Sequence, residues 1–240
     1  MKNVTLLALD TATEACSVAL LRGGEKTHLA QFAQHEHTKH ILPMVDEILA
    51  QAGITLSQVD TLVFGRGPGS FTGVRIGAGI AQGLAFGAEL PVIPVSNLAA
   101  MAQAAYAKYQ AENVLTAIDA RMNEVYFAQW QAQKVRSDFG EFLDWQPMIA
   151  EQVCSPSNVI EQVAQQHHEN IVLAGTGWAA YPELNDANLG KATEITLPSA
   201  LYMLDLALPK WFAGETISPL EIEPIYLRNE VTWKKLPGRE

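Results

Sequence analysis

A glycine-rich loop between an apolar run and a helix-forming stretch is the part of the sequence best suited to chemistry. The loop reads RGPGSFTG over residues 66–73 and contains Gly67, Gly69 and Ser70. Backbone N–H groups at the start of a helix can hold a phosphate or another anion. The loop lacks the lysine of a Walker A motif, however, and Thr72 takes the place of the last glycine of G-x-G-x-x-G. Two interpretations stay open: a phosphate site, or a tight turn that offers its backbone as a contact surface.

Asp10 closes the first apolar run and is followed by Thr11 in a turn of small residues. An aspartate at this place can hold a hydrated Mg²⁺ beside a nucleotide, or it can cap the turn without binding anything. The other candidates are weaker. None of His35, His37 and His40 is four residues from another, as H-E-x-x-H requires, and the sequence has no G-x-S-x-G nucleophile motif. The residues by themselves show no self-sufficient catalytic centre.

Length, composition and charge exclude several classes of protein. The chain has 240 residues, enough for one large domain or two small ones, and its 48% apolar content supplies a sizeable core. The net charge of −10 argues against an independent nucleic-acid binder and against binding to anionic membranes. Two cysteines cannot form a disulfide scaffold. Because no apolar run is long enough for a signal peptide or a membrane span, we expect a soluble, cytoplasmic protein.

The spacing of apolar residues predicts the elements that position Asp10 and the loop. We expect strands at 4–9, 16–21 and 26–33, a helix over 40–52, a strand at 59–64, a helix over 71–86, a strand at 91–95 and a helix capped by Ser96. The helix over 71–86 is rich in glycine, although each glycine costs a helix about 1 kcal/mol relative to alanine. So many glycines indicate that something approaches the backbone of this helix closely. The order βββ-α-β-α-β-α predicts a mixed sheet covered by helices.

A faint repeat suggests a second half built like the first. LALDTATEACSVAL at 7–20 aligns with TAIDARMNEVYFAQ at 116–129, which places Asp119 at the position of Asp10. The repeat predicts two similar halves, although two unrelated hairpins could match by chance. Further on, the pattern predicts strands at 114–118, 125–130 and 171–177 and an extended tail over 219–240, while residues 131–152 show no clear period. It also predicts one helix that begins at Ser155 and another over 199–213, which Pro209 must bend or end.

Three blocks of sequence allow a comparison with known proteins: LALDTATEACSVAL at 7–20, GRGPGSFTGVRIGAGIAQGLA at 65–85 and PIYLRNEVTWKK at 224–235. They closely resemble the bacterial TsaB (YeaZ) family, and the resemblance spans the chain. This family is similar to the actin-like, sugar-kinase-like ATPases, which have two ribonuclease-H-like α/β halves with an ATP cleft between them. The resemblance implies an N-terminal half over 1–110, a smaller, degenerate second half over 111–213, and a segment, 214–240, that can return to the first.

For function, the resemblance implies a partner subunit and not an enzyme. TsaB works with its paralogue TsaD and the small ATPase TsaE, and together they transfer a threonylcarbamoyl group from threonylcarbamoyl-AMP to N6 of the adenosine beside the tRNA anticodon. We expect TsaD and TsaE as partners, a homodimer when the chain is alone, contact with tRNA only through the complex, and none with membranes. The alternatives are a metallopeptidase-like or a small-molecule kinase-like enzyme, which would need a His/Glu ligand set or intact phosphate loops.

Departures from TsaD indicate that catalysis is lost. Where TsaD has P-V-H-H-M-E-G-H, with two metal-binding histidines four apart, this chain has Asn97 and Met101, so no metal is expected. The nucleotide cleft also looks degenerate, because Arg121 and Met122 replace small residues and bulky Trp178 stands in the adenosine-binding segment. We expect no cofactor in the isolated chain, although ATP or ADP could bind at the TsaD interface. The resemblance assigns to the degenerate cleft Asp10, Thr11, Gly67, Gly69, Ser70, Asp119 and Gly175.

If catalysis is lost, the function must lie on a surface. Glycine and alanine let a partner helix approach closely, and in the family the helices that match 40–52 and 72–86 pair with their counterparts in TsaD. The alternative is that this face packs inside the chain's own domain. The residues assigned to the partner interface are Ile41, Met44, Val45, Ile48, Gly73, Ile76, Gly77, Gly79, Ile80 and Gly83.

Overall fold

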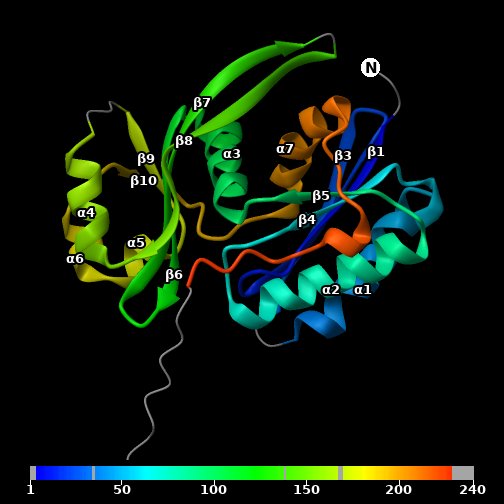
Figure 1. Ribbon diagram of the computed structural model, residues 1–240, viewed down its shortest axis with the longest axis horizontal. Helices are drawn as coiled ribbons and strands as arrows, with labels where there is room; N and C mark the ends of the chain where they lie inside the picture. The colour runs from blue at the N-terminus through cyan, green and yellow to red at the C-terminus, as the bar shows by residue number, and fades with distance from the viewer. Residues whose placement is uncertain (1–3, 34–35, 138, 167–169, 229–240) are drawn as a thin grey trace, which may run out of the picture.

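Two five-stranded sheets organise the chain in the computed structural model (Figure 1). The structure describes residues 4–33, 36–137, 139–166 and 170–228. The first sheet has the strand order β3-β2-β1-β4-β5, and the second has the order β10-β9-β6-β7-β8. In both sheets an antiparallel hairpin continues into a parallel neighbour, β4 beside β1 and β9 beside β6. The predicted α/β fold, with mixed sheets in two similar halves, is confirmed.

Helices bury the first sheet on both faces. Its strands are β1 (Thr5–Asp10), β2 (Ala15–Arg22), β3 (Glu25–Phe32), β4 (Thr61–Gly65) and β5 (Val92–Val95). Successive side chains of a strand point to opposite faces. Leu7 therefore packs in the core with α1 (His37–Gln51) and α2 (Phe71–Gly87), and Leu6 packs in the core with α7 (Ala200–Ala213). Burial on both faces explains why the first strand reads as a continuous apolar run.

The second sheet is covered in the same way by shorter helices. Its strands are β6 (Asn113–Arg121), β7 (Glu124–Ser137), β8 (Gly140–Cys154), β9 (Ile171–Ala174) and β10 (Lys191–Ala192). One face packs against α3 (Asn97–Tyr109), and the other packs against α4 (Pro156–Ala164), α5 (Gly177–Ala180) and α6 (Pro182–Asp186). No helix in the described part of the chain is long and apolar enough to cross a lipid bilayer.

The helices α3 and α7 pack across the predicted division at residue 110. Met101 of α3 lies in the core of the second sheet with Trp130, while Leu204 of α7 lies in the core of the first sheet with Leu6. Both helices also reach the other core, since Ala100 of α3 lies in the first and Leu206 of α7 packs against the second, so the division near residue 110 stays a prediction. Each helix packs on the sheet that its apolar side faces, and the order along the chain does not reveal which sheet that is.

The region without a clear period, 131–152, forms most of a long hairpin. The outer parts of β7 and β8 extend beyond the second sheet as an arm above α3 and α7 (Figure 1). The alternation of apolar and polar residues that is typical of a strand is lost here for two reasons. The pairing shifts register twice between Phe127 and Trp130, and the last five residues of β7 are exposed on both faces. A hairpin of this kind carries little signal in hydropathy.

Two prolines lie inside helices. The first long helix begins at His37, three residues before the predicted start, and it contains Pro43. The last helix continues through Pro209 to Ala213, and Gly214 ends it in the left-handed region with φ 73°. Of the two outcomes predicted for Pro209, an end of the helix is excluded. Each helix loses only one backbone hydrogen bond at its proline, and packing on the sheet compensates.

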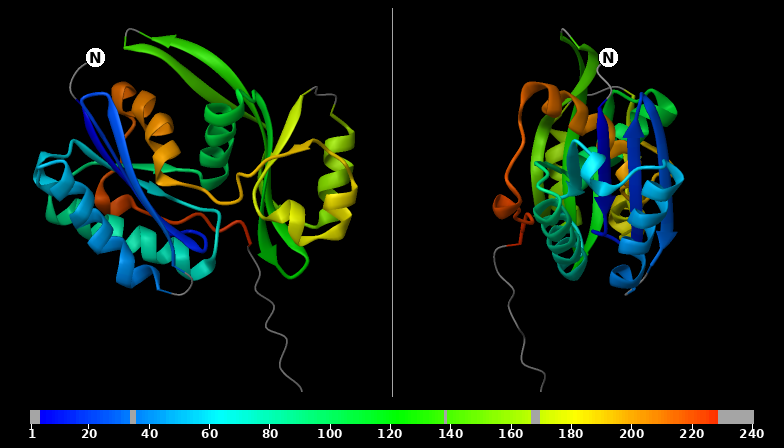
Figure 2. Two further views of the ribbon diagram at one scale, coloured as in Figure 1. Left: turned by 180° about the vertical axis from the view of Figure 1, so that it is seen from behind. Right: turned by 90° about the vertical axis from the view of Figure 1, so that its right-hand side faces the viewer.

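The segment after α7, residues 214–228, returns to the first half. Ile217 pairs with Val92, the 3₁₀ turn η2 (Pro219–Glu221) lies against α2, and Ile222 is buried in the first core. Figure 2 shows this segment running beside α2 from a second direction. Residues 222–228 form neither helix nor strand, and the rest of the predicted extended tail lies outside the described residues. The segment therefore links the surface of α2 to the space between the halves.

Candidate functional site

Five of the seven residues assigned to a nucleotide cleft come together at the end of β1. Asn97, at the start of α3, joins them. Its amide nitrogen donates to Asp10 Oδ1 at 2.7 Å, and its oxygen accepts from the backbone N–H of Gly67 at 2.8 Å. The N–H of Ser70 donates to the carbonyl of Ala12 at 2.7 Å. The loop and the first turn of the chain are thus closed on each other by internal hydrogen bonds.

Glycines make this closure possible. A Cβ on Gly69 would lie closer than 3.0 Å to the carbonyl oxygen of Ala12, and one on Gly73 would lie closer than 3.0 Å to that of Thr11. Thr11 also donates its hydroxyl to the carbonyl of Gly73 at 2.8 Å. Any larger residue would therefore push α2 away from the β1–β2 turn. The backbone that approaches this end of α2 belongs to the chain itself, and this favours the tight turn over the phosphate site.

Asp10 is held in an environment that disfavours its charge. Its carboxyl is 1% exposed, and its Oδ2 has no hydrogen-bond partner among the described residues. Burial raises the pKa of Asp10 to about 6, and the hydrogen bond from the Asn97 amide opposes that rise only in part. The carboxyl is therefore partly protonated near neutral pH, unlike an exposed aspartate.

A metal ion or a nucleotide phosphate does not fit at Asp10. The carboxyl is fully buried, and one oxygen is already bound to the Asn97 amide. Met101 lies in the second core with no exposed surface, so its thioether does not face the site. The described residues contain no group of three or more His, Cys, Asp or Glu side chains that could hold a metal ion.

Asp119 and Gly175 lie apart from Asp10, in the second half. Asp119 forms an ion pair with Arg121 at 3.0 Å and accepts the hydroxyl of Tyr181 at 2.8 Å. Gly175 has no room for a side chain, because a Cβ there would meet the carbonyl of Ala117. Asp119 therefore stabilises the β6–β7 turn, and Gly175 lets the segment after β9 pack against β6. A role of Arg121 and Met122 in keeping phosphate out of the cleft stays a prediction.

Arg228 connects the C-terminal segment to this turn. It donates to the carbonyl of Ala120 at 3.1 Å and forms an ion pair with Glu124. Just before it, the N–H of Ile225 donates to the carbonyl of Arg66 at 2.8 Å. The segment therefore spans from the glycine-rich loop to the second half. The sequence of this segment, PIYLR, predicted an extended conformation but not its contacts with both halves.

The expectation that Trp178 crowds the adenosine-binding segment is wrong. The indole is 7% exposed and meets Phe127 edge-on, with 6.3 Å between the ring centres. Its N–H donates to the carbonyl of Ala174 at 3.0 Å. Trp178 points into the core of the second half, because a short helix after β9 has to cover that face of the sheet.

Much of the predicted partner interface also lies inside the chain. Ile41, Met44, Val45 and Ile48 of α1 are at most 6% exposed and pack in the first core. Their stripe is the face that any amphipathic helix turns toward its sheet. Gly73 and Gly77 are buried as well, and a Cβ on Gly77 would lie closer than 3.0 Å to the hydroxyl of Thr11. These six residues do not form a free surface.

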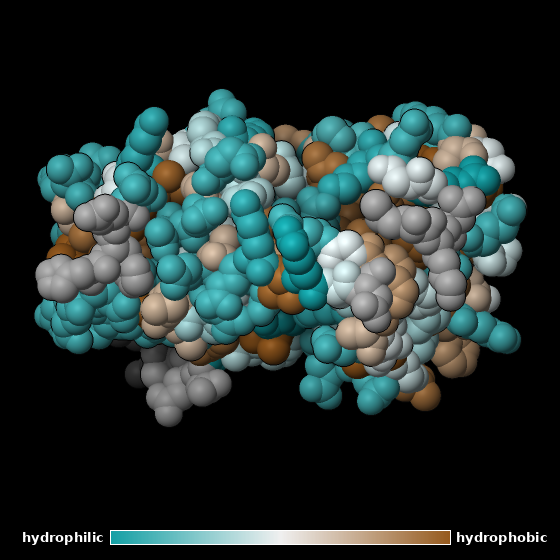
Figure 3. Space-filling model, turned by 90° about the horizontal axis from the view of Figure 1, so that it is seen from above, coloured by the Kyte–Doolittle hydropathy of each residue, from teal (hydrophilic) through white to brown (hydrophobic). Residues whose placement is uncertain are grey.

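The outer side of α2 is exposed and apolar. Gly79 and Gly83 have open space where a side chain would stand, while Ile76 and Ile80 are half-buried. Phe86, which was not among the residues predicted for this surface, is 65% exposed. The apolar positions recur every three or four residues, so helical spacing could have found it. By contrast, the face in Figure 3, which shows the top of the molecule as drawn in Figure 1, is mostly hydrophilic. We call Ile76, Gly79, Ile80, Gly83 and Phe86 the outer face of α2.

The two mixed sheets with their helices define the chain as a protein of the actin-like ATPase fold, built from two ribonuclease-H-like halves. The family model described as TsaD, tRNA N6-adenosine threonylcarbamoyltransferase, matches residues 29–208. The tRNA threonylcarbamoyladenosine biosynthesis protein TsaB of Haemophilus influenzae is 67% identical over all of both chains. That of Escherichia coli is 48% identical over 98% of this chain and 99% of its own. The chain belongs to the TsaB family.

Solved structures of the same family agree with the fold. YeaZ from Pseudomonas aeruginosa is 40% identical, covers 92% of this chain and 100% of its own, and superposes with a TM-score of 0.77. A second structure from that organism, described as similar to peptidase YeaZ, is 41% identical over 94% of this chain, with a TM-score of 0.79. The resemblance inferred from the three sequence blocks is confirmed.

The buried carboxyl gives a prediction for the variant Asp10→Asn. Because the pKa of Asp10 is raised from 3.8 to about 6, the folded state binds a proton more tightly than the unfolded state does. The contribution of Asp10 to the free energy of unfolding should therefore be largest below pH 4, fall as the pH rises to about 6 and level off above that, with a total loss on the order of 3 kcal/mol. In Asp10→Asn this loss should disappear.

Urea unfolding between pH 4 and pH 8 measures the effect, with Asp46→Asn as the matched control. Asp46 is exposed on α1, so its variant should keep the wild-type dependence on pH. Identical pH dependence in wild type and Asp10→Asn would show that Asp10 is not the group responsible.

Proposed function

We propose that the chain is a non-catalytic subunit that acts with TsaD and TsaE. In this proposal the three proteins transfer a threonylcarbamoyl group from threonylcarbamoyl-AMP to N6 of the adenosine beside the tRNA anticodon. The observation that carries the proposal is the closed end of β1, where the Asn97 side chain is hydrogen-bonded to both Asp10 and the Gly67 N–H. The names of the H. influenzae and E. coli relatives support the pathway.

The closed site argues against catalysis by this chain. Phosphate binding at a helix start needs free backbone N–H groups, but those of Gly67, Ser70 and Gly73 all donate to partners within the chain. Within the described residues, neither the ligand set of a metallopeptidase nor an open phosphate loop of a kinase is present. The two enzyme alternatives therefore lack a supporting observation.

The outer face of α2 is the surface that would meet TsaD. Gly79 and Gly83 would let a partner helix approach closely, and Ile76 and Phe86 would supply apolar contact area. Leu220 on η2, which is 74% exposed, extends this surface. The same face would hold two copies together when TsaD is absent, and ATP or ADP would bind only where TsaD completes the site. With a net charge of −10, the chain would contact tRNA only through the complex.

We expect the isolated chain to release no phosphate from ATP, because Asp10 is buried and the N–H groups of Gly67, Ser70 and Gly73 already donate within the chain. A phosphate-release assay on the purified chain, with and without Mg²⁺, checks this. The mixture with TsaD and TsaE serves as the positive control. A steady rate in the isolated chain that is lost in Asp10→Asn would contradict the non-catalytic role.

We expect Gly83→Phe to weaken binding to TsaD at least tenfold. The added ring would stand where two helix backbones meet, and overpacking at such a place costs about 1–3 kcal/mol. The fold should survive, because no atom lies within 4 Å of a Cβ at Gly83. Circular dichroism tests folding, and titration calorimetry with TsaD tests binding.

The matched control is Ala164→Phe, which places the same ring at an exposed position of α4 in the second half. It should bind TsaD as the wild type does. A folded Gly83→Phe protein with wild-type affinity for TsaD would move the interface away from α2. Loss of binding in both variants would mean that the ring disturbs the protein in general.

A further inference from the structure

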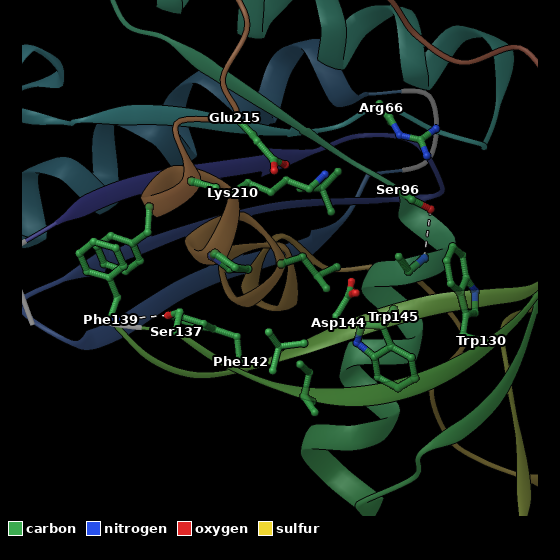
Figure 4. Close-up of a pocket in the computed structure, with 18 residues that line it drawn as sticks. Arg66, Ser96, Trp130, Ser137, Phe139, Phe142, Asp144, Trp145, Lys210 and Glu215 are labelled. Atoms are coloured by element: carbon green, nitrogen blue, oxygen red, sulfur yellow. Dashed lines mark hydrogen bonds between the residues drawn. The ribbon is translucent and has the colours of Figure 1, made fainter.

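A pocket lies under the β7–β8 arm, on the side facing α3 and α7. Its volume is about 600 Å³, which is the size of a typical small-molecule site. Figure 4 shows Phe139 at one end, Arg66 and Ser96 at the other, and Lys210 between them. The first half, α7 and the arm all contribute to the wall. The pocket is separate from the closed site at Asp10 and from the outer face of α2.

One end of the pocket is aromatic. The rings of Phe139 and Phe212 stack with 4.5 Å between their centres and 5° between their planes. Phe142 lies 6.1 Å from Phe212, ring centre to ring centre. These three residues, which we call the phenylalanine cluster, join the tip of the arm to the end of α7. They offer an apolar surface to a ligand body.

The other end of the pocket holds two cations whose hydrogen-bonding capacity is mostly unused. Lys210 makes one long hydrogen bond, 3.4 Å to the carbonyl of Pro94, and no ion pair among the described residues. Arg66 donates from one nitrogen to Glu151 at 2.6 Å, although a guanidinium has five N–H donors. Both side chains are half-buried. An ammonium in such a place normally has a counter-ion.

The electrostatics favour an anion beside Lys210. Burial lowers the pKa of Lys210, and the positive charge of Arg66 lowers it further. The carboxylates of Glu215, Glu151 and Asp144 oppose this effect. Glu151 already pairs with Arg66, while Asp144 and Glu215 are exposed, so water screens their charges. The positive charges of Arg66 and Lys210 therefore attract an anionic group to this end of the pocket.

We propose that this pocket binds a small amphipathic carboxylate, with its carboxylate group at Arg66 and Lys210 and its apolar body against the phenylalanine cluster. The assignment rests on the joining of an aromatic wall and an unpaired cation within one cavity of suitable size. Neither feature would be enough without the other. It is independent of the proposed partnership with TsaD.

Displacement of a fluorescent probe from the full-length protein tests the proposal. The probe is 8-anilinonaphthalene-1-sulfonate, an aromatic monoanion that brightens in apolar pockets. Octanoate should displace it at about one-tenth of the concentration needed for 1-octanol, because a charge-assisted hydrogen bond to Lys210 is available only to the acid. In Lys210→Gln this preference should shrink below about threefold, and Lys210→Arg should keep it.

A second pair of variants separates the pocket from other apolar surfaces. Phe212→Ala should weaken the binding of the probe, whereas Phe86→Ser, which changes the outer face of α2, should leave it unchanged. Circular dichroism confirms that each variant is folded. Equal displacement by octanoate and 1-octanol in the wild type would overturn the proposal. So would a preference for octanoate that survives in Lys210→Gln, or probe binding that depends on Phe86 and not on Phe212.

Discussion

The buried hydrogen bonds of Asn97 hold the first half together at the point where its strands end. A side-chain amide has a donor and an acceptor on separate atoms, and here its nitrogen donates to Asp10 while its oxygen accepts from the Gly67 N–H. Neither partner is accessible to water. Replacing Asn97 by an apolar residue would leave the Gly67 N–H unsatisfied, at a cost of about 1–3 kcal/mol, and would leave Asp10 Oδ1 with only its 3.3 Å hydrogen bond from the Ala12 N–H. A histidine at this position would alter the same pair of contacts.

The closure around Asn97 depends in turn on backbone packing. Gly69 and Gly73 bring the loop and the start of α2 against the carbonyls of Ala12 and Thr11, closer than any side chain would allow. An anion would have to break these contacts to reach the N–H groups. The local fold thus uses for its own structure the features that, in an open loop, would hold a phosphate.

The sequence predicted the first half well, because its apolar runs lie in elements that are buried on one or both faces. It did not predict the arm, since most residues of the outer β7–β8 hairpin are exposed and the pairing shifts register. Nor could it show which sheets α3 and α7 pack against, because hydropathy gives the apolar side of a helix and not its partner. The residues around Asp10 could be listed from the sequence. The direction in which Trp178 and the apolar stripe of α1 point could not, because it depends on tertiary packing. The pocket under the arm left no trace in the sequence, because Arg66, Phe139 and Lys210 are brought together only by the fold.

The glycines of α2 illustrate this limit most clearly. Composition indicated a close approach to the backbone of this helix, and Gly73 and Gly77 do meet Thr11 of the same chain closely. Gly79 and Gly83 repeat the same four-residue spacing on another side of the helix, where the space is open. The six residues from Gly73 to Gly79 turn the helix by about 240° beyond one full turn, so the two pairs cannot share a face. One pair packs against the β1–β2 turn, and the other leaves open space beside Phe86. A single helix can therefore pack closely against its own chain on one side and present an open apolar side to solvent.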